Sequence, residues 1–161
     1  MTLRAPAIAL SPLLLLLLAA CAYQGTRSGA RLPPLSADPA QPALALLEHV
    51  LTGYFAEAGV NGPTTCVTLA PTALTAKQEV ALIVRLVRLA PASRCVDRGS
   101  GVVDAMTGAP AQRVQLYDFA CAGPALCRGW ITRPGATAMR YTLRFADGAW
   151  RFDGDPRLIG E

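Results

Sequence analysis

The segment that most restricts the fold of this chain is MRYTLRFADGAWRF, residues 139–152. Asp147-Gly148 predicts a two-residue type I′ turn, because both residue types tolerate a positive φ. The turn sets Phe145 opposite Trp150, and alternation then directs every second side chain to the same side. The apolar residues that share this side are Tyr141, Leu143, Phe145, Trp150 and Phe152. The segment therefore predicts a β-hairpin with its apolar side toward the core.

Two segments carry helical signals. Residues 43–58 repeat apolar residues at helical spacing, and His49 lies opposite the apolar stripe, where we expect it to be solvated. Thr75-Ala76-Lys77-Gln78 matches a capping box and predicts a second helix from Gln78 to Leu89. This second segment is apolar over most of its circumference, which favours a buried helix with a narrow wet edge. A strand through VALIVRLV is the alternative.

Shorter segments before the hairpin have the composition of strands. They are Thr65–Leu69, SRCV at 93–96 and AQRVQLYDF at 111–119. Together with the hairpin they predict an α+β fold, in which two helices pack on one face of a four- to six-stranded antiparallel sheet. The element order resembles that of cystatin-like and NTF2-like cones. Such a cone would leave room for a small ligand between the helices and the sheet.

Five cysteines divide into one near the N-terminus and four in the body of the chain. An even number in an exported domain indicates disulfides, with three possible connectivities. Chain geometry favours the pairs Cys66–Cys95 and Cys121–Cys127. A zinc site is the weaker alternative, because Cys-x-x-Cys is absent and His49 is the only histidine. A redox-active Cys121/Cys127 pair is the other alternative.

The N-terminal segment has the pattern of a secretory signal peptide. Arg4 precedes an apolar stretch from Ala5 to Ala20, which is shorter than the roughly 20 residues that a membrane span needs. The stretch ends in Leu18-Ala19-Ala20-Cys21, which resembles the lipobox of bacterial lipoprotein precursors. The resemblance implies cleavage before Cys21 and lipidation of its thiol, so that acyl chains hold the protein on a membrane. An ordinary signal peptide is the alternative.

The same resemblance implies where the protein resides and how the chain is divided. Ala22 follows the cysteine where some families carry Asp to remain at the inner membrane, so the outer membrane is favoured, with the body facing the periplasm. Residues 1–20 are then the signal peptide. Residues 21–42 are rich in proline and lack apolar periodicity, which predicts a disordered tether. Residues 43–161 are predicted to form a single domain.

The arginines of the C-terminal hairpin form the one candidate binding site that the sequence indicates. The net charge is +4, and 14 of the 15 basic residues are arginine. Arg140, Arg144 and Arg151 are expected on the outer side of the C-terminal hairpin, with Arg144 directly opposite Arg151. Like charges in this position are destabilising unless water, a carboxylate or a bound anion lies between them. The alternatives are a solvated surface and a site for an anionic envelope component.

The sequence lacks the motifs of several functional classes. The chain contains neither a Gly-x-Ser-x-Gly elbow nor a His-Glu-x-x-His or Walker-type motif, and its basic residues do not alternate with aromatics as in nucleic-acid binders. Asp147 and Asp153-Gly154-Asp155 offer too few ligands for a calcium loop. The sequence thus favours a non-catalytic lipoprotein with a periplasmic interaction domain, without cofactor or metal. Its expected partners are the membrane and an anionic or protein component of the envelope. The alternative is a ligand-binding or enzymatic cone.

Overall fold

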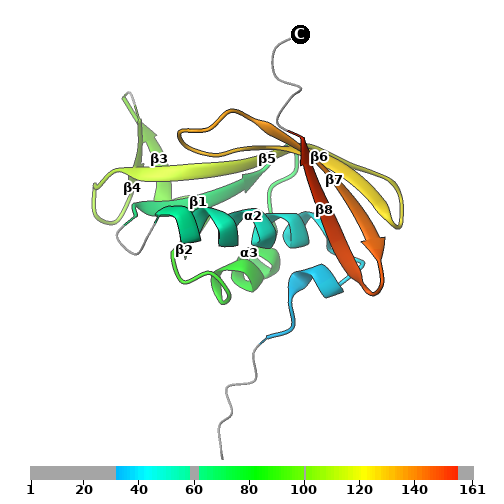
Figure 1. Cartoon of the computed structure of the whole chain (residues 1–161). Helices are drawn as coiled ribbons and strands as arrows, with labels where there is room; N and C mark the ends of the chain where they lie inside the picture. The colour runs from blue at the N-terminus through cyan, green and yellow to red at the C-terminus, as the bar shows by residue number, and fades with distance from the viewer. Residues whose placement is uncertain (1–31, 59–61, 100, 156–161) are drawn as a thin grey trace, which may run out of the picture. The chain divides into compact units, whose positions relative to one another are not determined.

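The computed structural model describes residues 32–58, 62–99 and 101–155 (Figure 1). Its helices are η2 (Leu35–Ala37), α2 (Pro42–Ala58), α3 (Ala76–Ile83) and η3 (Ala92–Arg94). Its strands are β1 (Thr64–Leu69), β2 (Leu89–Ala90), β3 (Cys95–Arg98), β4 (Gly101–Asp104), β5 (Ala111–Gly123), β6 (Leu126–Thr132), β7 (Met139–Ala146) and β8 (Ala149–Asp155).

The main sheet has six strands in the order β2-β1-β5-β6-β7-β8, and it curls around the helices in Figure 1. β1 pairs in parallel with both β2 and β5, whereas β5 to β8 are antiparallel. The sheet is therefore mixed, and the prediction of helices on an antiparallel sheet, with the cystatin-like or NTF2-like cone, is wrong. Parallel neighbours need a crossover of a dozen or more residues. Here the connection from β1 to β2 supplies one, because it contains α3.

The C-terminal hairpin has the predicted turn and register. Phe145 faces Trp150 and Arg144 faces Arg151 across β7 and β8. Asp147 and Gly148 have φ values of 52° and 72°, as a type I′ turn requires. The five apolar residues that alternation assigned to one side all belong to the main core cluster or pack against it.

Helix α2 lies against the concave side of the sheet and supplies more residues to the main core than any other single element. Its buried residues are Leu44, Ala45, Leu46, Leu47, Val50, Leu51 and Tyr54. They meet Val67, Val114, Leu116, Ile131, Leu143 and Trp150 of the sheet. The space between helix and sheet is thus filled by side chains.

The second helix differs from its prediction. The capping box is present, since Gln78 N donates to Thr75 Oγ1 and Thr75 N donates to Gln78 Oε1. The helix ends at Ile83, however, and Leu89 belongs to strand β2. Its outer side is not a narrow polar edge, because Val80 and Val84 are each 57% exposed.

The ordered domain begins before the predicted boundary at residue 43. Leu35 of η2 is buried, and its backbone N–H donates to Glu48 Oε2 at 2.7 Å. The indole Nε1 of Trp150 donates to the carbonyl oxygen of Asp38 at 3.0 Å. These contacts join the last third of the predicted tether to α2 and β8. Residues 21–31 lie outside the described part of the chain.

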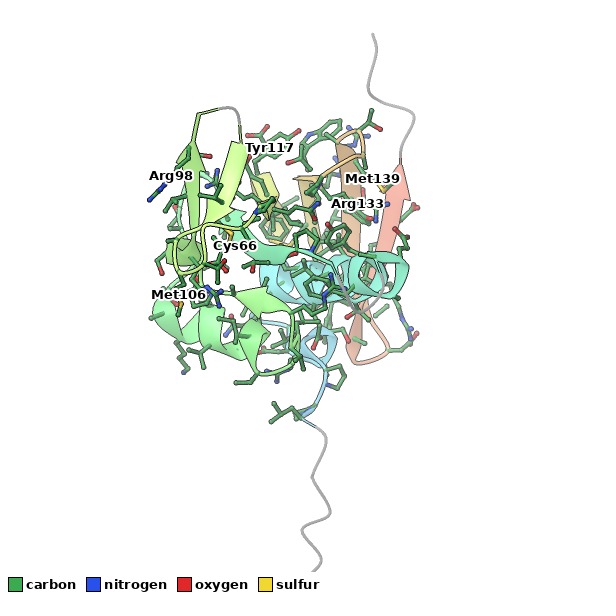
Figure 2. The ribbon with its side chains drawn as sticks, turned by 90° about the vertical axis from the view of Figure 1, so that its left-hand side faces the viewer. Cys66, Arg98, Met106, Tyr117, Arg133 and Met139 are labelled. Carbon is green, nitrogen blue, oxygen red and sulfur yellow. A yellow bond between two sulfur atoms is a disulfide. The ribbon has the colours of Figure 1, made fainter. Side chains whose placement is uncertain are left out.

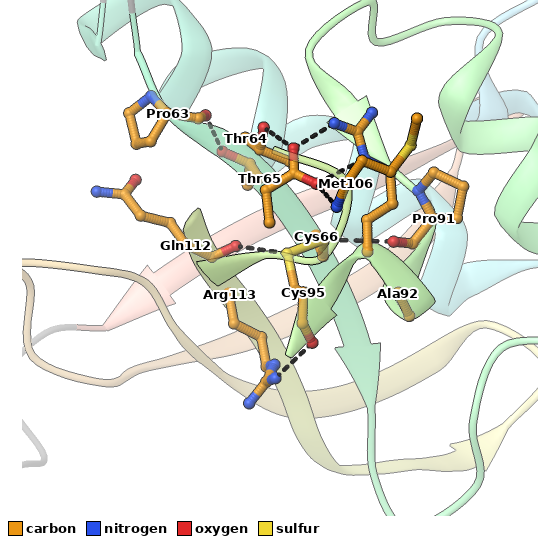
Figure 3. The surroundings of a disulfide bond; sticks show 12 residues. Pro63, Thr64, Thr65, Cys66, Pro91, Ala92, Cys95, Met106, Gln112 and Arg113 are labelled. Carbon is orange, nitrogen blue, oxygen red and sulfur yellow. Dashed lines mark hydrogen bonds and ion pairs between the residues drawn. A yellow bond between two sulfur atoms is a disulfide. The ribbon is translucent and has the colours of Figure 1, made fainter. Parts of the chain in front are cut away.

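Strands β3 and β4 form a separate two-stranded sheet beside β1 and β5. A small second core of Cys66, Ala90, Cys95 and Ala111 lies beneath it. The Cys66–Cys95 disulfide joins β1 to β3, and Figure 3 shows Arg113 reaching the carbonyl oxygen of Cys95, at 3.0 Å. The β3–β4 unit thus covers the outer side of the sheet at β1 and leaves the outer side of β6 to β8 open.

Candidate functional site

The outer side of β5 to β8 forms the candidate site, which we call the arginine face. It is defined by Tyr117 of β5, Leu126, Arg128 and Trp130 of β6, Arg140, Thr142 and Arg144 of β7, and Arg151 and Asp153 of β8. Sheet register sets these residues in rows across the strands: Tyr117 with Trp130 and Arg140, Arg128 with Thr142 and Asp153, and Leu126 with Arg144 and Arg151. Side chains opposite one another on a pleated sheet lie on the same side.

An aromatic pair forms one end of the arginine face. The rings of Tyr117 and Trp130 stack with centroids 6.4 Å apart and an interplanar angle of 14°. The guanidinium carbon of Arg140 lies 5.9 Å from the centroid of the Trp130 ring, within cation–π range. The three side chains therefore hold one another in place and form a flat platform that is both apolar and positively charged.

A cluster of unpaired arginines forms the other end. Arg144 and Arg151 face each other in register and both are exposed. Arg128, on the neighbouring strand, is also exposed. None of these three guanidinium groups forms an ion pair with any residue that the structure describes. Four arginines thus share a surface on which Asp153 is the acidic residue whose side chain is described, so the local potential is positive.

Two shallow hollows border these arginines at the turn between β5 and β6. One, of about 340 Å³, is lined by residues 122–126 together with Arg144. The other, of about 310 Å³, includes Cys121, Cys127 and Arg128. Both are open and mainly apolar. They give the arginine face places where a side chain of a partner could insert next to a guanidinium group.

The structure places the predicted site residues as follows. Arg140, Arg144 and Arg151 share the outer side of the hairpin, as alternation predicts. Cysteine pairing is that favoured from the sequence: Cys66 with Cys95 and Cys121 with Cys127. Cys21 lies outside the described residues.

His49 is exposed and stacks on Phe152, with ring centroids 4.4 Å apart. Partial burial lowers the pKa of His49, so its ring is mainly neutral at pH 7. His49 is thus exposed, as the helical spacing of residues 43–58 predicts, but its ring also meets the Tyr141 ring edge-on, with centroids 6.4 Å apart, so it is not surrounded by solvent as expected.

Sequence reasoning missed Tyr117, Arg128 and Trp130. The alternation in Leu126–Thr132 would have marked Arg128 and Trp130 as residues of one strand side. Their place beside Arg140 and Arg144 depends on the pairing of β6 with β7 across the Pro134-Gly135 turn. That Pro-Gly pair is the local signal that could have indicated the pairing.

A second polar cluster is internal. Asp104 is 1% exposed, and its carboxylate accepts hydrogen bonds from Arg94, Thr64 Oγ1 and Met106 N. The hydrogen bonds from Arg94 and then from Met106 hold the pKa of Asp104 well below its usual range. Because both carboxylate oxygens are buried and accept hydrogen bonds from the surrounding residues, this cluster stabilises the β4–β5 turn rather than forming an open site.

Metal ligands are not gathered in the described ranges: no group of three or more His, Cys, Asp or Glu residues there is placed to hold an ion. Within the same residues, no helix has the length and apolar character of a membrane span. The two disulfides are typical of proteins that fold in an oxidising, extracytoplasmic compartment.

Comparison with protein-family models, with curated proteins and with solved structures gave no match to this chain. The arginine face and the sequence signals at the N-terminus are therefore the features of this chain that indicate a function.

Proposed function

We propose that this protein is a lipid-anchored bacterial lipoprotein whose domain binds, without catalysis, an acidic protein surface in the cell envelope. The resemblance of Leu18–Cys21 to a lipobox supports the anchor, and the disulfides agree with an oxidising compartment. The single observation that supports the binding role is the cluster of exposed arginines that have no ion-pair partner among the described residues, next to a stacked Tyr–Trp pair. In this proposal the anchor lies in the outer membrane and the domain faces the periplasm.

The composition of the arginine face favours a protein partner. Trp, Tyr and Arg are the residue types most enriched among the energetically dominant residues of protein interfaces. Small-molecule sites are usually concave and enclose most of the ligand. The arginine face is instead an open sheet surface, bordered by the two shallow hollows. A broad partner carrying carboxylates could pair with Arg128, Arg144 and Arg151 at the same time and cover the aromatic platform.

The positive charges of the arginine face favour an acidic partner. Arg144 and Arg151 repel each other in the free protein, and an acidic partner would relieve this repulsion while accepting two-pronged hydrogen bonds from the guanidinium groups. Complementary charge also accelerates encounter and discriminates among partners. We therefore expect binding that weakens as salt concentration rises.

Photo-crosslinking in the native cell tests this proposal. A photoreactive residue at Thr142, in the middle of the arginine face, should capture a defined envelope protein with an acidic surface. Arg144→Gln/Arg151→Gln should abolish the capture, whereas Arg98→Gln, which removes an exposed arginine of the β3–β4 unit, should leave it intact. A Cys21→Ser chain should lose the capture together with its membrane attachment. The same capture in all four proteins would contradict a role for the arginine face.

A further inference from the structure

We infer that the outer side of α3 is a membrane-contacting surface that rests on the bilayer to which the chain is anchored. We call it the valine face and define it by Leu32, Lys77, Val80, Val84 and Val87. This inference depends on the lipid anchor of the proposed function. It adds a second contact with the membrane and a fixed orientation of the domain.

The valine face consists mainly of exposed apolar side chains. Val80 and Val84 are each 57% exposed, and Val87 is 97% exposed. Val80 and Val84 are four residues apart, and the N–H of Val84, the C-cap of α3, donates to the carbonyl oxygen of Val80, so the two side chains lie on the same side of the last helical turn. Val87 lies in the turn that follows the helix. The opposite side of α3 carries Leu82, which is fully buried. The exposed valines are thus a second apolar stripe that no described residue covers.

The charge of the valine face suits a bilayer with anionic lipids. The exposed residues of α3 are Ala76, Lys77 and Val80, so the one charge among them is positive. Glu79, the acidic residue of the helix, is half-buried and accepts a hydrogen bond from the backbone N–H of Ala92. Apolar residues next to a basic side chain are typical of helices that lie in the headgroup region.

The chain enters the domain beside this surface. The guanidinium Nη2 of Arg85 donates to the carbonyl oxygen of Pro33 at 3.1 Å, so the first described residues lie next to the end of α3. Leu32 is itself 50% exposed. Figures 1 and 2 show α3 and the start of the described chain on the same side of the domain, and Figure 2 places Tyr117 of the arginine face at the other end.

The anchor then brings the valine face to the membrane. Eleven residue steps separate Cys21 from Leu32, and such a segment spans at most about 40 Å in any conformation. A lipidated Cys21 therefore keeps this side of the domain within reach of the headgroups. Tethering raises the effective concentration, so that even a small apolar surface makes a lasting contact. The arginine face, on the other side of the sheet from the helices, would remain free for its partner.

Tryptophan quenching tests the contact. The mature chain, residues 21–161, is coupled through the Cys21 thiol to a maleimide lipid in vesicles of phosphatidylcholine and phosphatidylglycerol. The phosphatidylcholine acyl chains are either brominated, which quenches tryptophan, or plain. We expect Val84→Trp to lose its added fluorescence in brominated vesicles. Thr142→Trp, on the arginine face, should keep its fluorescence in both. An unquenched Val84→Trp, or equal quenching of both reporters, would overturn the inference.

Charge substitutions show whether the valines carry the contact. Val80→Asp/Val87→Asp in the Val84→Trp chain should abolish the quenching, because both positions are exposed and neither supports the core. Met106→Asp is the matched control, since Met106 is 76% exposed but lies in the β4–β5 turn. Quenching that survives the double substitution would overturn the inference. So would sedimentation showing that the unanchored chain dimerises through the same valines.

Failure of the inference and failure of the proposed anchor are distinguishable. Chemical coupling supplies the attachment in the vesicle experiment, so the quenching result does not depend on lipidation in the cell. Mass spectrometry of the N-terminal peptide from bacterial membranes tests lipidation of Cys21 separately. An unmodified Cys21 would overturn the anchor, and with it this orientation, whatever the vesicles show.

Discussion

At the scale of single residues, Asp104 is a buried charge whose hydrogen bonds stabilise the fold. Its carboxylate has no access to solvent, yet Arg94, Thr64 and Met106 N satisfy its oxygens. A buried ion held by one dominant cation is costly to disrupt, because removal of either partner leaves the other uncompensated. The cluster links β1, η3 and the β4–β5 turn, three segments that are far apart in the sequence.

We predict that Asp104→Asn lowers the melting temperature at pH 7 and reduces the acid sensitivity of the protein. The pKa of Asp104 is lower in the folded state than in the unfolded chain. Its stabilising contribution is therefore complete above the unfolded value of about 3.9 and is lost as the pH falls toward the folded value. Thermal unfolding followed from about pH 7 to pH 2 should show the two proteins converging. A difference that grows with acidification would contradict this assignment.

At the scale of elements, the outer side of the β7–β8 hairpin retains a repulsion between Arg144 and Arg151 that the fold does not relieve. We expect Arg144→Gln/Arg151→Gln to stabilise the free protein by about 0.5 kcal/mol at low salt. The gain should disappear at about 1 M salt, where the screening length falls to about 3 Å. Urea unfolding at both ionic strengths measures it. Arg98→Gln, outside the arginine face, is the control and should give no comparable gain in stability. A loss of stability in the double variant would mean that other groups of the protein already offset the repulsion between Arg144 and Arg151.

The two disulfides connect elements over different lengths of chain. Cys66 and Cys95 are 29 residues apart, whereas Cys121 and Cys127 are 6 apart. On the loop-entropy model, the longer connection contributes about 3.6 kcal/mol and the shorter about 2.4 kcal/mol. We therefore predict that replacing Cys66 and Cys95 by serine lowers the free energy of unfolding more than replacing Cys121 and Cys127. Urea titration of the two double variants gives the comparison, and the reverse order would show that local strain or packing outweighs chain entropy.

At the scale of the whole domain, the segment before α2 is part of the fold. Leu35 is buried, and Asp38 accepts the hydrogen bond of the Trp150 indole from the last strand. Glu48 is held by the N–H of Leu35 and by Arg85, whose Nε lies 3.4 Å from Glu48 Oε1. Residues 33–38 therefore connect α2, the end of α3 and β8, and they fix the point at which an anchored chain enters the domain.

We predict that a chain beginning at residue 43 is less stable than one beginning at residue 32 by at least about 2 kcal/mol. Burial of Leu35 contributes about 1.5–3 kcal/mol, and the hydrogen bond of Trp150 adds about 1 kcal/mol. Urea unfolding followed by tryptophan fluorescence compares the two chains, and Leu35→Ala in the longer chain should reproduce much of the loss. Equal stability would show that residues 32–42 merely rest on the surface.

The sequence by itself determined the local features whose causes lie within a few residues. The Asp147-Gly148 turn, the hairpin register, the Thr75–Gln78 cap, the helical stripe of residues 43–58 and the alternation that exposes Arg140, Arg144 and Arg151 all follow from backbone preferences and periodicity. The disulfide pairs favoured from chain spacing also occur, because nearby cysteines close the least costly loops.

Only the tertiary structure decided how these elements combine. Parallel pairing of β1 with β2 and β5 depends on how the α3 crossover packs, and no local pattern states it. Val80, Val84 and Val87 look like core residues in the sequence, yet they are exposed, whereas Leu82 and Leu86 of the same segment belong to the core. Likewise Tyr117, Trp130 and Arg128 join the arginine face only through strand order. Periodicity assigns a side chain to one side of an element, but the packing of the other elements decides whether that side meets the core, the solvent or a partner.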